Sequence, residues 1–314
     1  MNTYKYIFGP IPSRRLGISL GVDLVKHKIC TLDCVYCEVG KTTCLTLERK
    51  EYIPTSEILD ELEFFLADSP KLDYITFSGA GEPTLHSGLE YMANQIKQKY
   101  PQYKLALITN GTLFYLPEVR AAVKNIDCIL PSLDAVSESI FHTINRPDSL
   151  LQNSTIIDGL IKLRHEYSGV ILLEIFIIPG LNDSDDELKL LINAVSKIKP
   201  DVVQLNTLDR PGTESWVHKP TKERLDEIAL SFAPQKVEII AKFNKKPIDS
   251  GYNIDVEFGI IEYLKRRPAT MSDLCSGLSR HVNEISKYIT HLLDIDFIES
   301  VSNNDDFYYR IKNN

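Results

Sequence analysis

The sequence predicts an α/β fold: a partial (β/α)6 barrel of the TIM type, followed by a small C-terminal domain. Short runs rich in β-branched residues alternate with amphipathic helical patterns, which is typical of βα units around a parallel sheet. Glycine and polar residues follow the ends of these runs, where (β/α) barrels hold their functional groups. From about residue 255 the pattern changes to three helices and two short strand-like runs.

Six short runs are the predicted strands of the barrel, at residues 18–23, 74–77, 105–108, 128–130, 170–177 and 202–206. The segments between them have the periodicity of amphipathic helices. In residues 185–198, for example, one helix face would carry Leu188, Leu191, Ile192, Val195 and Ile198. Six such units predict a partial barrel.

The composition is that of a folded protein, with 43% hydrophobic residues, 25% charged residues and a net charge of −8. The negative charge argues against a protein whose whole surface binds nucleic acid. The N-terminus lacks the pattern of a signal peptide, and the longest apolar run, 170–178, is interrupted by Glu174 and is too short to span a bilayer. Six cysteines, three of them clustered, fit a reducing compartment better than a secreted disulfide framework. We therefore expect a cytoplasmic protein that has no membrane partner.

Three cysteines within eight residues, Cys30, Cys34 and Cys37, form the most informative motif of the chain. Thiolates select zinc, copper(I) or iron–sulfur clusters, and a [4Fe–4S] cube takes one ligand for each iron. A structural zinc site needs a fourth ligand, and Cys44 lies seven residues further on in a segment unlike a zinc knuckle. The spacing therefore favours a cluster with one open iron, with zinc and a disulfide as the alternatives.

The cysteine motif, with the aromatic Tyr36 before its last cysteine, resembles that of the radical S-adenosylmethionine (SAM) superfamily. The resemblance implies that Cys30, Cys34 and Cys37 hold a [4Fe–4S] cluster, that SAM chelates the open iron, and that Tyr36 lies against the cofactors. It also implies reductive cleavage of SAM to a 5′-deoxyadenosyl radical, which abstracts hydrogen from a substrate. An electron donor such as flavodoxin or ferredoxin, and sensitivity to oxygen, follow from that chemistry.

A second motif, Gly79-Ala80-Gly81-Glu82-Pro83, follows the second predicted strand. Its last four residues resemble the Gly-Gly-Glu-Pro motif of the superfamily, with Ala80 in place of the first glycine. In that family the backbone of the motif pairs with the amino group of SAM, so we expect Gly79, Ala80, Gly81 and Glu82 to contact the cofactor. The alternative is an ordinary Gly-Pro turn after a strand.

Four further polar residues follow the third and fourth predicted strands. The resemblance places Ser132, Asp134 and Arg146 where the superfamily holds the ribose and carboxylate of SAM, and Asn110 has a similar position. A guanidinium suits a carboxylate because it offers a planar fork of donors. The alternatives are a surface arginine in a turn before Pro147 and an asparagine that favours a left-handed turn before glycine.

Glu174 interrupts an otherwise apolar strand that a parallel sheet would bury on both faces. Gln204 and Asn206 share one face of the next strand, so a polar barrel interior is predicted there. A carboxylate inside a barrel needs a partner. We expect Glu174 and Asn206 to bind SAM or substrate, with a structural hydrogen-bond network as the alternative.

Basic residues flank the first predicted strand, with Arg14 and Arg15 before it and Lys26, His27 and Lys28 after it. They could bind an anionic substrate or position the cluster. For the two lysines, surface charge is the interpretation that we favour. For the two arginines both interpretations stay open.

The pattern assigns residues 1–244 to the barrel, 245–254 to a linker and 255–314 to the C-terminal domain. This domain has predicted helices at 257–265, 272–278 and 282–293 and strands at 297–301 and 307–311, an order that looks like a winged helix. It holds seven Lys and Arg against ten Asp and Glu, whereas phosphate binding favours the opposite sign. A contact with protein, or presentation of a substrate, is therefore at least as well supported as nucleic-acid binding.

The run Pro-Ser-Arg-Arg-Leu-Gly at residues 12–17, together with the cysteine motif, resembles a group of radical SAM proteins that are similar to the tRNA wyosine-synthesis enzymes. Those enzymes bind a second cluster through cysteines upstream of the triad, and none precedes Cys30 here. Three hypotheses follow: modification of an RNA base, modification of a peptide or small metabolite, and an iron–sulfur sensor with a DNA-binding tail. Glu82 and the polar residues at the strand ends favour an enzyme, because a sensor has no need of a SAM pocket.

Overall fold

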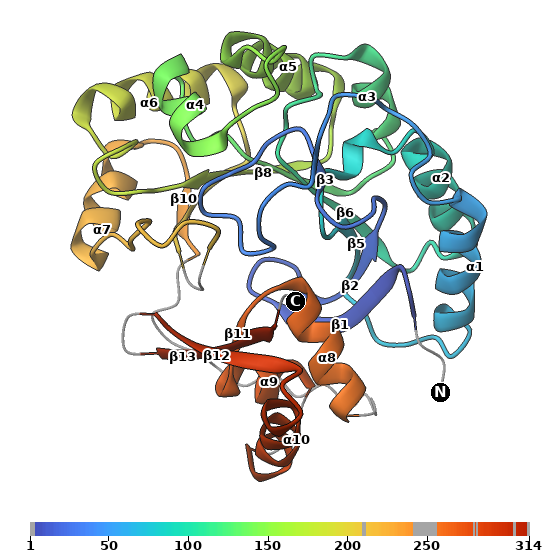
Figure 1. Cartoon of the computed structure of the whole chain (residues 1–314). Coiled ribbons are helices and arrows are strands. Elements are labelled where there is room, and N and C mark those ends of the chain that lie inside the picture. Colours follow the sequence, from blue (N-terminus) through green and yellow to red (C-terminus); the bar gives the residue numbers. More distant parts are fainter. Residues whose placement is uncertain are drawn as a thin grey trace.

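The computed structural model describes residues 4–208, 212–240, 256–278, 280, 282–303 and 306–312. Its main body is an eight-stranded sheet that curves into a partial barrel, with helices along its outer side (Figure 1). The strand order is β1-β2-β5-β6-β7-β8-β9-β10, and all neighbours run parallel except β1 and β2. β1 and β10 lie at the two edges, so the barrel is open between them. The predicted α/β class is confirmed.

The strands of this sheet are β1 (Ile7–Ser13), β2 (Gly17–Asp23), β5 (Tyr74–Ser78), β6 (Lys104–Thr109), β7 (Cys128–Pro131), β8 (Val170–Phe176), β9 (Val202–Asn206) and β10 (Val237–Ile239). The helices around it are α1 (Thr55–Leu66), α2 (Leu89–Lys99), α3 (Pro117–Ala122), α4 (Glu138–Asn145), α5 (Asn153–Glu166), α6 (Asp185–Ile198) and α7 (Lys222–Ser231), with the 3-10 helix η1 (Pro83–Leu85). All six predicted strands are present, with bounds within one residue of those expected. A small parallel pair, β3 (Ile29–Cys30) and β4 (Cys44–Leu45), follows β2. Among the described residues, no helix is long and apolar enough to cross a membrane.

Helix α6 illustrates how the sequence forms the outer layer. Ser184 caps its N-terminus by accepting a hydrogen bond from the Glu187 backbone N at 3.3 Å. The predicted apolar stripe is buried against the sheet, with Leu191, Val195 and Ile198 at its centre, except for Ile192, which is half-buried. Full burial of each such side chain contributes about 1.5–3 kcal/mol, so the stripe rather than helix propensity fixes this helix on the barrel.

The sequence did not predict the two edge strands. β1 contains Pro10 and Pro12, which have no N–H to donate to a sheet, and proline is tolerated at a sheet edge. β10 has three residues, which is too short for any periodicity to be read. Pairing with an already formed neighbour, rather than local pattern, makes both of them strands.

The two faces of the curved sheet carry separate apolar clusters. Side chains of the outer face, such as Leu20 and Leu107, belong to the large core under the helices. The inner face holds a smaller buried cluster, which consists of Leu16, Ala106, Cys128 and Leu130. Leu16 comes from the turn between β1 and β2, so this turn fills part of the barrel interior.

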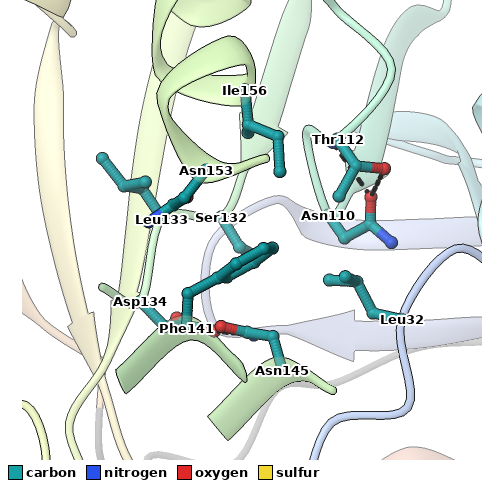
Figure 2. Close-up of a pocket in the computed structure, with 10 residues that line it drawn as sticks. All are labelled: Leu32, Asn110, Thr112, Ser132, Leu133, Asp134, Phe141, Asn145, Asn153 and Ile156. Atoms are coloured by element: carbon teal, nitrogen blue, oxygen red, sulfur yellow. Dashed lines mark hydrogen bonds between the residues drawn. The ribbon is translucent and has the colours of Figure 1, made fainter. Parts of the chain in front are cut away.

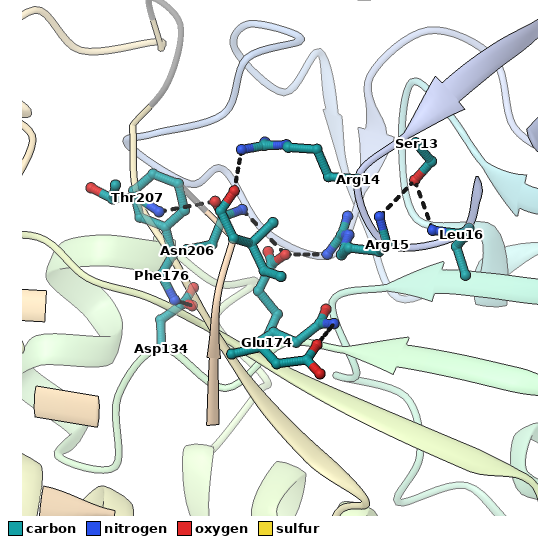
Figure 3. Close-up of polar contacts among 12 residues, drawn as sticks. Ser13, Arg14, Arg15, Leu16, Asp134, Glu174, Phe176, Asn206 and Thr207 are labelled. Atoms are coloured by element: carbon teal, nitrogen blue, oxygen red, sulfur yellow. Dashed lines mark hydrogen bonds and ion pairs between the residues drawn. The ribbon is translucent and has the colours of Figure 1, made fainter. Parts of the chain in front are cut away.

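The same turn connects the two edges of the open barrel. Arg14 Nη1 donates to the backbone oxygen of Ile240, just after β10, and Arg15 forms an ion pair with Glu174 of β8 (Figure 3). Both arginines, whose role the sequence left open, therefore make contacts across the barrel, and Arg14 is exposed while it does so. The turn acts as a brace between strands that do not pair.

The C-terminal unit consists of α8 (Val256–Arg266), β11 (Ala269–Thr270), α9 (Met271–Leu278), α10 (Val282–Asp294), β12 (Ile298–Asn303) and β13 (Asp306–Ile311). Its three strands form an antiparallel sheet in the order β11-β13-β12. A core of its own includes Ile260, Leu274, Ile285 and Ile289. The predicted helices and the two predicted strands are present, and the predicted linker, 245–254, lies outside the described residues.

The C-terminal unit lies beside β1 of the barrel (Figure 1). At this contact, Arg266 at the end of α8 pairs with Asp23 at the end of β2. The guanidinium also lies over the ring of Phe8, 4.1 Å from its centroid. A cation in a site of this kind gains from both the carboxylate and the ring, which fixes the two units against each other.

Candidate functional site

The three cysteines lie in the loop after β2, at the carboxyl ends of the strands. The sulfur of each accepts a hydrogen bond from a nitrogen donor of a different segment. Asn110 Nδ2 lies 3.5 Å from Cys30 Sγ, Asn145 Nδ2 lies 3.4 Å from Cys34 Sγ, and Lys28 Nζ lies 3.0 Å from Cys37 Sγ. Donors of this kind stabilise sulfur that carries negative charge, as metal-bound thiolate does.

Burial disfavours the thiolate form of two of these cysteines. It raises the pKa of Cys30 to about 11, with a further contribution from the Glu82 carboxylate, and it raises the pKa of Cys34 well above its ordinary value. Desolvation opposes the charge of Lys28, but Cys37 and Cys30 act against it and the pKa of Lys28 is raised overall. A bound metal cation reverses the cost of the buried thiolates, so these residues suit a cationic iron–sulfur centre.

Asn110 joins the end of β6 to the cysteine loop. Its Nδ2 also donates to Thr31 Oγ1 at 2.8 Å, and its Oδ1 accepts from Thr112 N at 3.1 Å and from Thr112 Oγ1 at 2.8 Å (Figure 2). The amide is therefore fixed in orientation, with its N–H directed at the cysteine loop. That Asn110 belongs to the site stays a prediction, and its contact with Cys30 Sγ supports it.

Glu82 is buried, and both of its carboxylate oxygens accept hydrogen bonds from the protein. Oε1 accepts from Thr84 N, Thr84 Oγ1 and Thr109 Oγ1 at 3.0, 2.6 and 2.6 Å, and Oε2 accepts from Asn110 N at 2.7 Å. Burial raises the pKa of Glu82, while these donors act in the opposite direction. The carboxylate thus holds the ends of β5 and β6 together.

The Gly79–Gly81 loop is fastened to the segment that leads into the cysteines. Lys28 N donates to Ala80 O at 2.6 Å, and Glu82 N donates to Ile29 O at 3.0 Å. Gly79 has φ +115, and a Cβ there would collide with the Asp23 carboxylate. At Gly81 a Cβ would collide with the Ile29 carbonyl oxygen. Glycine is needed at Gly79 because of its positive φ and the neighbouring Asp23 carboxylate, and at Gly81 because the Ile29 backbone approaches so closely.

Asp134 connects the cysteine loop to α4 and β8. Its Oδ2 accepts from Tyr36 Oη at 2.6 Å and from Asn145 Nδ2 at 2.7 Å, and its Oδ1 accepts from Phe176 N at 2.9 Å. The ring of Tyr36 stacks on that of Phe176, with 3.8 Å between centroids. Burial raises the pKa of Asp134 to about 6. Through Asn145, which the sequence analysis missed, Asp134 orients the donor to Cys34.

Ser132 and Asp134 line a small cavity between the barrel rim and α4 (Figure 2). Its other lining residues are Leu32, Asn110, Thr112, Leu133, Phe141, Asn145, Asn153 and Ile156. Among the described residues, the buried side-chain oxygens without a hydrogen-bond partner include Asn145 Oδ1 and Asn153 Oδ1. Two unpartnered acceptors at one cavity favour a bound water or a ligand group that donates hydrogen bonds.

Arg146 ends α4 in the left-handed conformation, with φ +44, and its backbone oxygen accepts from Asp33 N of the cysteine loop at 3.2 Å. Its Nη1 pairs with Glu214 Oε1 at 2.7 Å. Glu214 belongs to a segment that crosses the cysteine loop, where Thr213 Oγ1 donates to Cys37 O at 3.0 Å and Glu214 N donates to Val35 O at 3.0 Å. The helix-ending turn expected as the alternative is present, and Arg146 supports the covering segment.

Glu174 and Asn206 lie together on the inner face of the barrel, as predicted. Glu174 Oε2 pairs with Arg15 and accepts from Asn206 Nδ2 at 3.2 Å (Figure 3). Gln204 is the register partner of Glu174 on β9, and its Oε1 is buried without a partner among the described residues. The contacts present are those of the structural network that was the alternative, with Arg15 as the partner that the carboxylate needed.

The basic residues before the cysteines divide into two kinds. Lys26 and His27 are exposed, which agrees with the prediction of surface charge. Lys28 is 3% exposed, so for this lysine the prediction was wrong.

Cys44 is exposed on β4. In the part of the chain that the structure describes, no group of three or more His, Cys, Asp or Glu side chains is arranged to hold a single metal ion.

The sequence profile of the Radical SAM superfamily matches residues 24–192. The chain belongs to the radical SAM superfamily. The matched region begins just after β2 and contains the cysteine loop, the Gly79–Glu82 loop and Asp134. The protein is accordingly an enzyme that uses a [4Fe–4S] cluster and SAM, as members of this superfamily do.

Curated relatives share more of the chain. It is 34% identical over 298 residues to a protein named GTPase Obg of Brachyspira hyodysenteriae, a match that covers 92% of this chain and 43% of that protein. It is 32% identical over 254 residues to a UPF0026 protein of Methanocaldococcus jannaschii, covering 79% of this chain and 78% of that one. The chain therefore also belongs to the UPF0026 family, while it spans less than half the length of the first relative.

Two further relatives are named for their reactions. The chain is 27% identical over 214 residues to the ribosomal RNA large subunit methyltransferase Cfr of Lachnoclostridium phytofermentans, covering 63% of this chain and 60% of that one. It is 25% identical over 171 residues to the GTP 3′,8-cyclase of Streptomyces coelicolor, covering 54% and 48%. One name concerns RNA and the other a nucleotide.

Solved structures share the fold. A radical SAM methyltransferase from Sphaerobacter thermophilus has a TM-score of 0.57 at 16% identity, covering 72% of this chain and 67% of that chain. Streptococcus suis SuiB bound to SAM has a TM-score of 0.52 at 11% identity, covering 71% and 50%. The curved parallel sheet of this protein is thus the partial barrel of radical SAM enzymes.

Proposed function

We propose that Cys30, Cys34 and Cys37 hold the [4Fe–4S] cluster and that SAM binds its fourth iron. The observation that supports this most directly is the set of three sulfurs with three separate nitrogen donors, at the end of the barrel where (β/α) enzymes react. The residues fit the group: soft ligands for three irons, polar donors around them, and a glycine loop that approaches closely. When bound, the cluster and SAM supply a reductively generated 5′-deoxyadenosyl radical.

Within this proposal the residues of the site have two different roles, which are to contact SAM and to position the groups that do. The backbone of Gly79, Ala80 and Gly81, with Asn110 and Ser132, forms the surface offered to SAM. The carboxylate oxygens of Glu82 and Asp134 accept hydrogen bonds from protein donors. These two residues therefore position the strand ends and the cysteine loop rather than contact the cofactor. Tyr36 is held by Asp134 and Phe176 and would form one wall of the site.

The inner network supports a role in holding substrate. Arg15, Glu174 and Asn206 are partly buried on the inner face, and Gln204 adds an acceptor without a partner among the described residues. Polar groups of both signs inside a barrel suit a substrate that is itself polar. Arg146, paired with Glu214, would keep the covering segment on the cysteine loop, and so shield the radical from water.

The test is anaerobic reconstitution with iron and sulfide, followed by SAM and dithionite. We expect an iron–sulfur absorbance and formation of 5′-deoxyadenosine by the wild-type protein. Cys34→Ala should form none, whereas Cys44→Ala, an exposed cysteine outside the triad, should behave as the wild type. Equal product from wild type and Cys34→Ala would exclude the assigned ligands.

For the substrate we propose a base in RNA. The similarity to a ribosomal RNA methyltransferase supports this. The C-terminal unit, which we propose is a winged helix on the basis of its three helices and antiparallel strands, supports it as well. The experiment is incubation of the active enzyme with RNA prepared from cells lacking the gene, with nucleosides compared by mass spectrometry. We expect a new nucleoside, and we expect deuterium from labelled RNA to appear in 5′-deoxyadenosine. An unchanged nucleoside profile would contradict RNA as the substrate.

A second candidate is a small nucleotide metabolite or a peptide. The similarity to GTP 3′,8-cyclase and the net negative charge of residues 255–314 favour it. Here the acidic C-terminal unit would contact a protein partner. Transfer of deuterium from a labelled nucleotide or peptide, but not from RNA, would support this candidate over the first.

A further inference from the structure

Lys28 is a lysine that the fold buries against sulfur. Its side chain is 3% exposed, while the neighbouring Lys26 and His27 are exposed. Its backbone has φ +52, in the left-handed region that non-glycine residues seldom adopt. Its Nζ ends 3.0 Å from Cys37 Sγ.

The position of Lys28 is fixed from both sides. Its N–H donates to Ala80 O at 2.6 Å, and its carbonyl oxygen accepts from Thr43 N at 3.0 Å and from Cys44 N at 3.1 Å. The side chain therefore leaves a backbone that is tied to the glycine loop and to β4. A buried ammonium is costly without a negative partner, and the group that its Nζ contacts is the sulfur of Cys37.

The three donors to the cysteine sulfurs are not equivalent. Asn110 and Asn145 are neutral amides at 3.5 and 3.4 Å, whereas Lys28 is a cation at 3.0 Å. A hydrogen bond from a charged donor is shorter and stronger than one between neutral groups. Lys28 is therefore the charged donor of the three, and the sulfur that it contacts is that of Cys37.

We propose that Lys28 is a positioning residue that raises the reduction potential of the cluster by placing a fixed positive charge against Cys37. The inference rests on the cluster assigned in the proposed function. One electron passes from an external low-potential reductant to the oxidised cluster, no bond breaks, and the reduced cluster carries one more negative charge. A cation at this distance stabilises the more negative state, and charge and hydrogen bonds at the sulfurs are known levers on cluster potential.

The test is a redox titration of the reconstituted full-length protein, followed by electron paramagnetic resonance of the reduced cluster. Lys28→Gln keeps N–H donors but removes the charge, and Lys28→Arg keeps the charge. At a fixed potential, we expect the ratio of reduced to oxidised cluster to fall about tenfold in Lys28→Gln, equivalent to ~59 mV for one electron. Lys28→Arg and the exposed control Lys26→Gln should stay within about twofold of the wild type.

The inference would be overturned if the ratio of reduced to oxidised cluster in Lys28→Gln equalled that of the wild type. It would also be overturned if this ratio fell as far in Lys28→Arg as in Lys28→Gln. If Lys28→Gln retains no cluster, a measurement on the wild type decides. Protein grown with lysine labelled by ¹⁵N at Nζ should show a ¹⁵N hyperfine coupling to the reduced cluster, and its absence would overturn the contact. A wild-type protein that assembles no cluster contradicts the proposed function instead, so the two failures are distinguishable.

Discussion

The cluster rim and the C-terminal unit of this protein are built in opposite ways. We define the cluster rim as the three cysteines with Lys28, Glu82, Asn110, Asp134 and Asn145. Its polar side chains are joined by hydrogen bonds between residues far apart in the sequence: 80 residues separate Asn110 from Cys30, and 111 separate Asn145 from Cys34. The C-terminal unit has polar contacts that are mostly local, such as Thr270 with Asp273, around an apolar core.

The difference teaches where each region is vulnerable. In the rim one side chain serves two partners, so that Asp134 holds both Tyr36 and Asn145, and one substitution disturbs several contacts. In the C-terminal unit stability comes from burial of apolar side chains, which tolerates surface change and fails when the core loses volume. The following predictions, from the largest expected effect to the smallest, test this contrast.

The largest effect is expected from Cys34→Ala in the rim. With two thiolates in place of three, we expect the formation of 5′-deoxyadenosine to fall by more than about 10³-fold, since the chemistry depends on the cluster. Iron content and product are measured together on the reconstituted protein. If product formation survives, the rim is not the catalytic end of the barrel.

Ile285→Ala should damage the C-terminal unit while leaving the rim intact. Ile285 is fully buried in that core, and its truncation should lower the free energy of unfolding of the unit by about 2–4 kcal/mol. Calorimetry should show a low-temperature transition, with 5′-deoxyadenosine formation within about twofold of the wild type. Loss of cluster in this variant would break the comparison, because the two regions would then depend on each other.

Glu82→Gln tests whether the rim depends on a complete set of acceptors. The new NH₂ group would face N–H and O–H donors, such as Asn110 N, from which the carboxylate accepts hydrogen bonds in the wild type. The substitution should therefore lower the free energy of unfolding by about 2 kcal/mol. Thermal unfolding and the dissociation constant for SAM are measured against Glu48→Gln, an exposed carboxylate paired with Lys50. A variant as stable as this control would show that the acceptors of Glu82 are dispensable.

Arg266→Met tests the contact that joins the two regions. Arg266 pairs with Asp23, whose Oδ1 accepts from Ala80 N at 3.2 Å, so its loss leaves a buried carboxylate short of a partner beside the glycine loop. We expect a loss of about 1–2 kcal/mol and faster proteolysis between the units. Arg310→Met, which removes an exposed pair with Glu299 in the same unit, should cost below about 0.5 kcal/mol. If the two substitutions lowered stability equally, the pair of Arg266 with Asp23 would not be what holds the two regions together.

The sequence predicted the C-terminal unit and the six inner strands well because their signals are local. Apolar periodicity sets the burial of α6 and α10, and short β-branched runs set the parallel strands. It missed β1 and β10, which depend on pairing, and it placed Lys28 at the surface. Burial of a lysine depends on which other segments fold over it, here Ala80 and Thr43, and no local pattern contains that information.

By itself the sequence determined the α/β class, the order of the six inner strands, and three thiols at a spacing that suits one soft metal centre. These follow from periodicity and from ligand chemistry within a few residues. Only the tertiary structure decided which groups meet those thiols, that Asp134 and Glu82 brace the rim, and that Arg15 is the partner of Glu174. The reason is physical: a hydrogen bond or an ion pair depends on distance in space, which chain folding sets after local structure has formed.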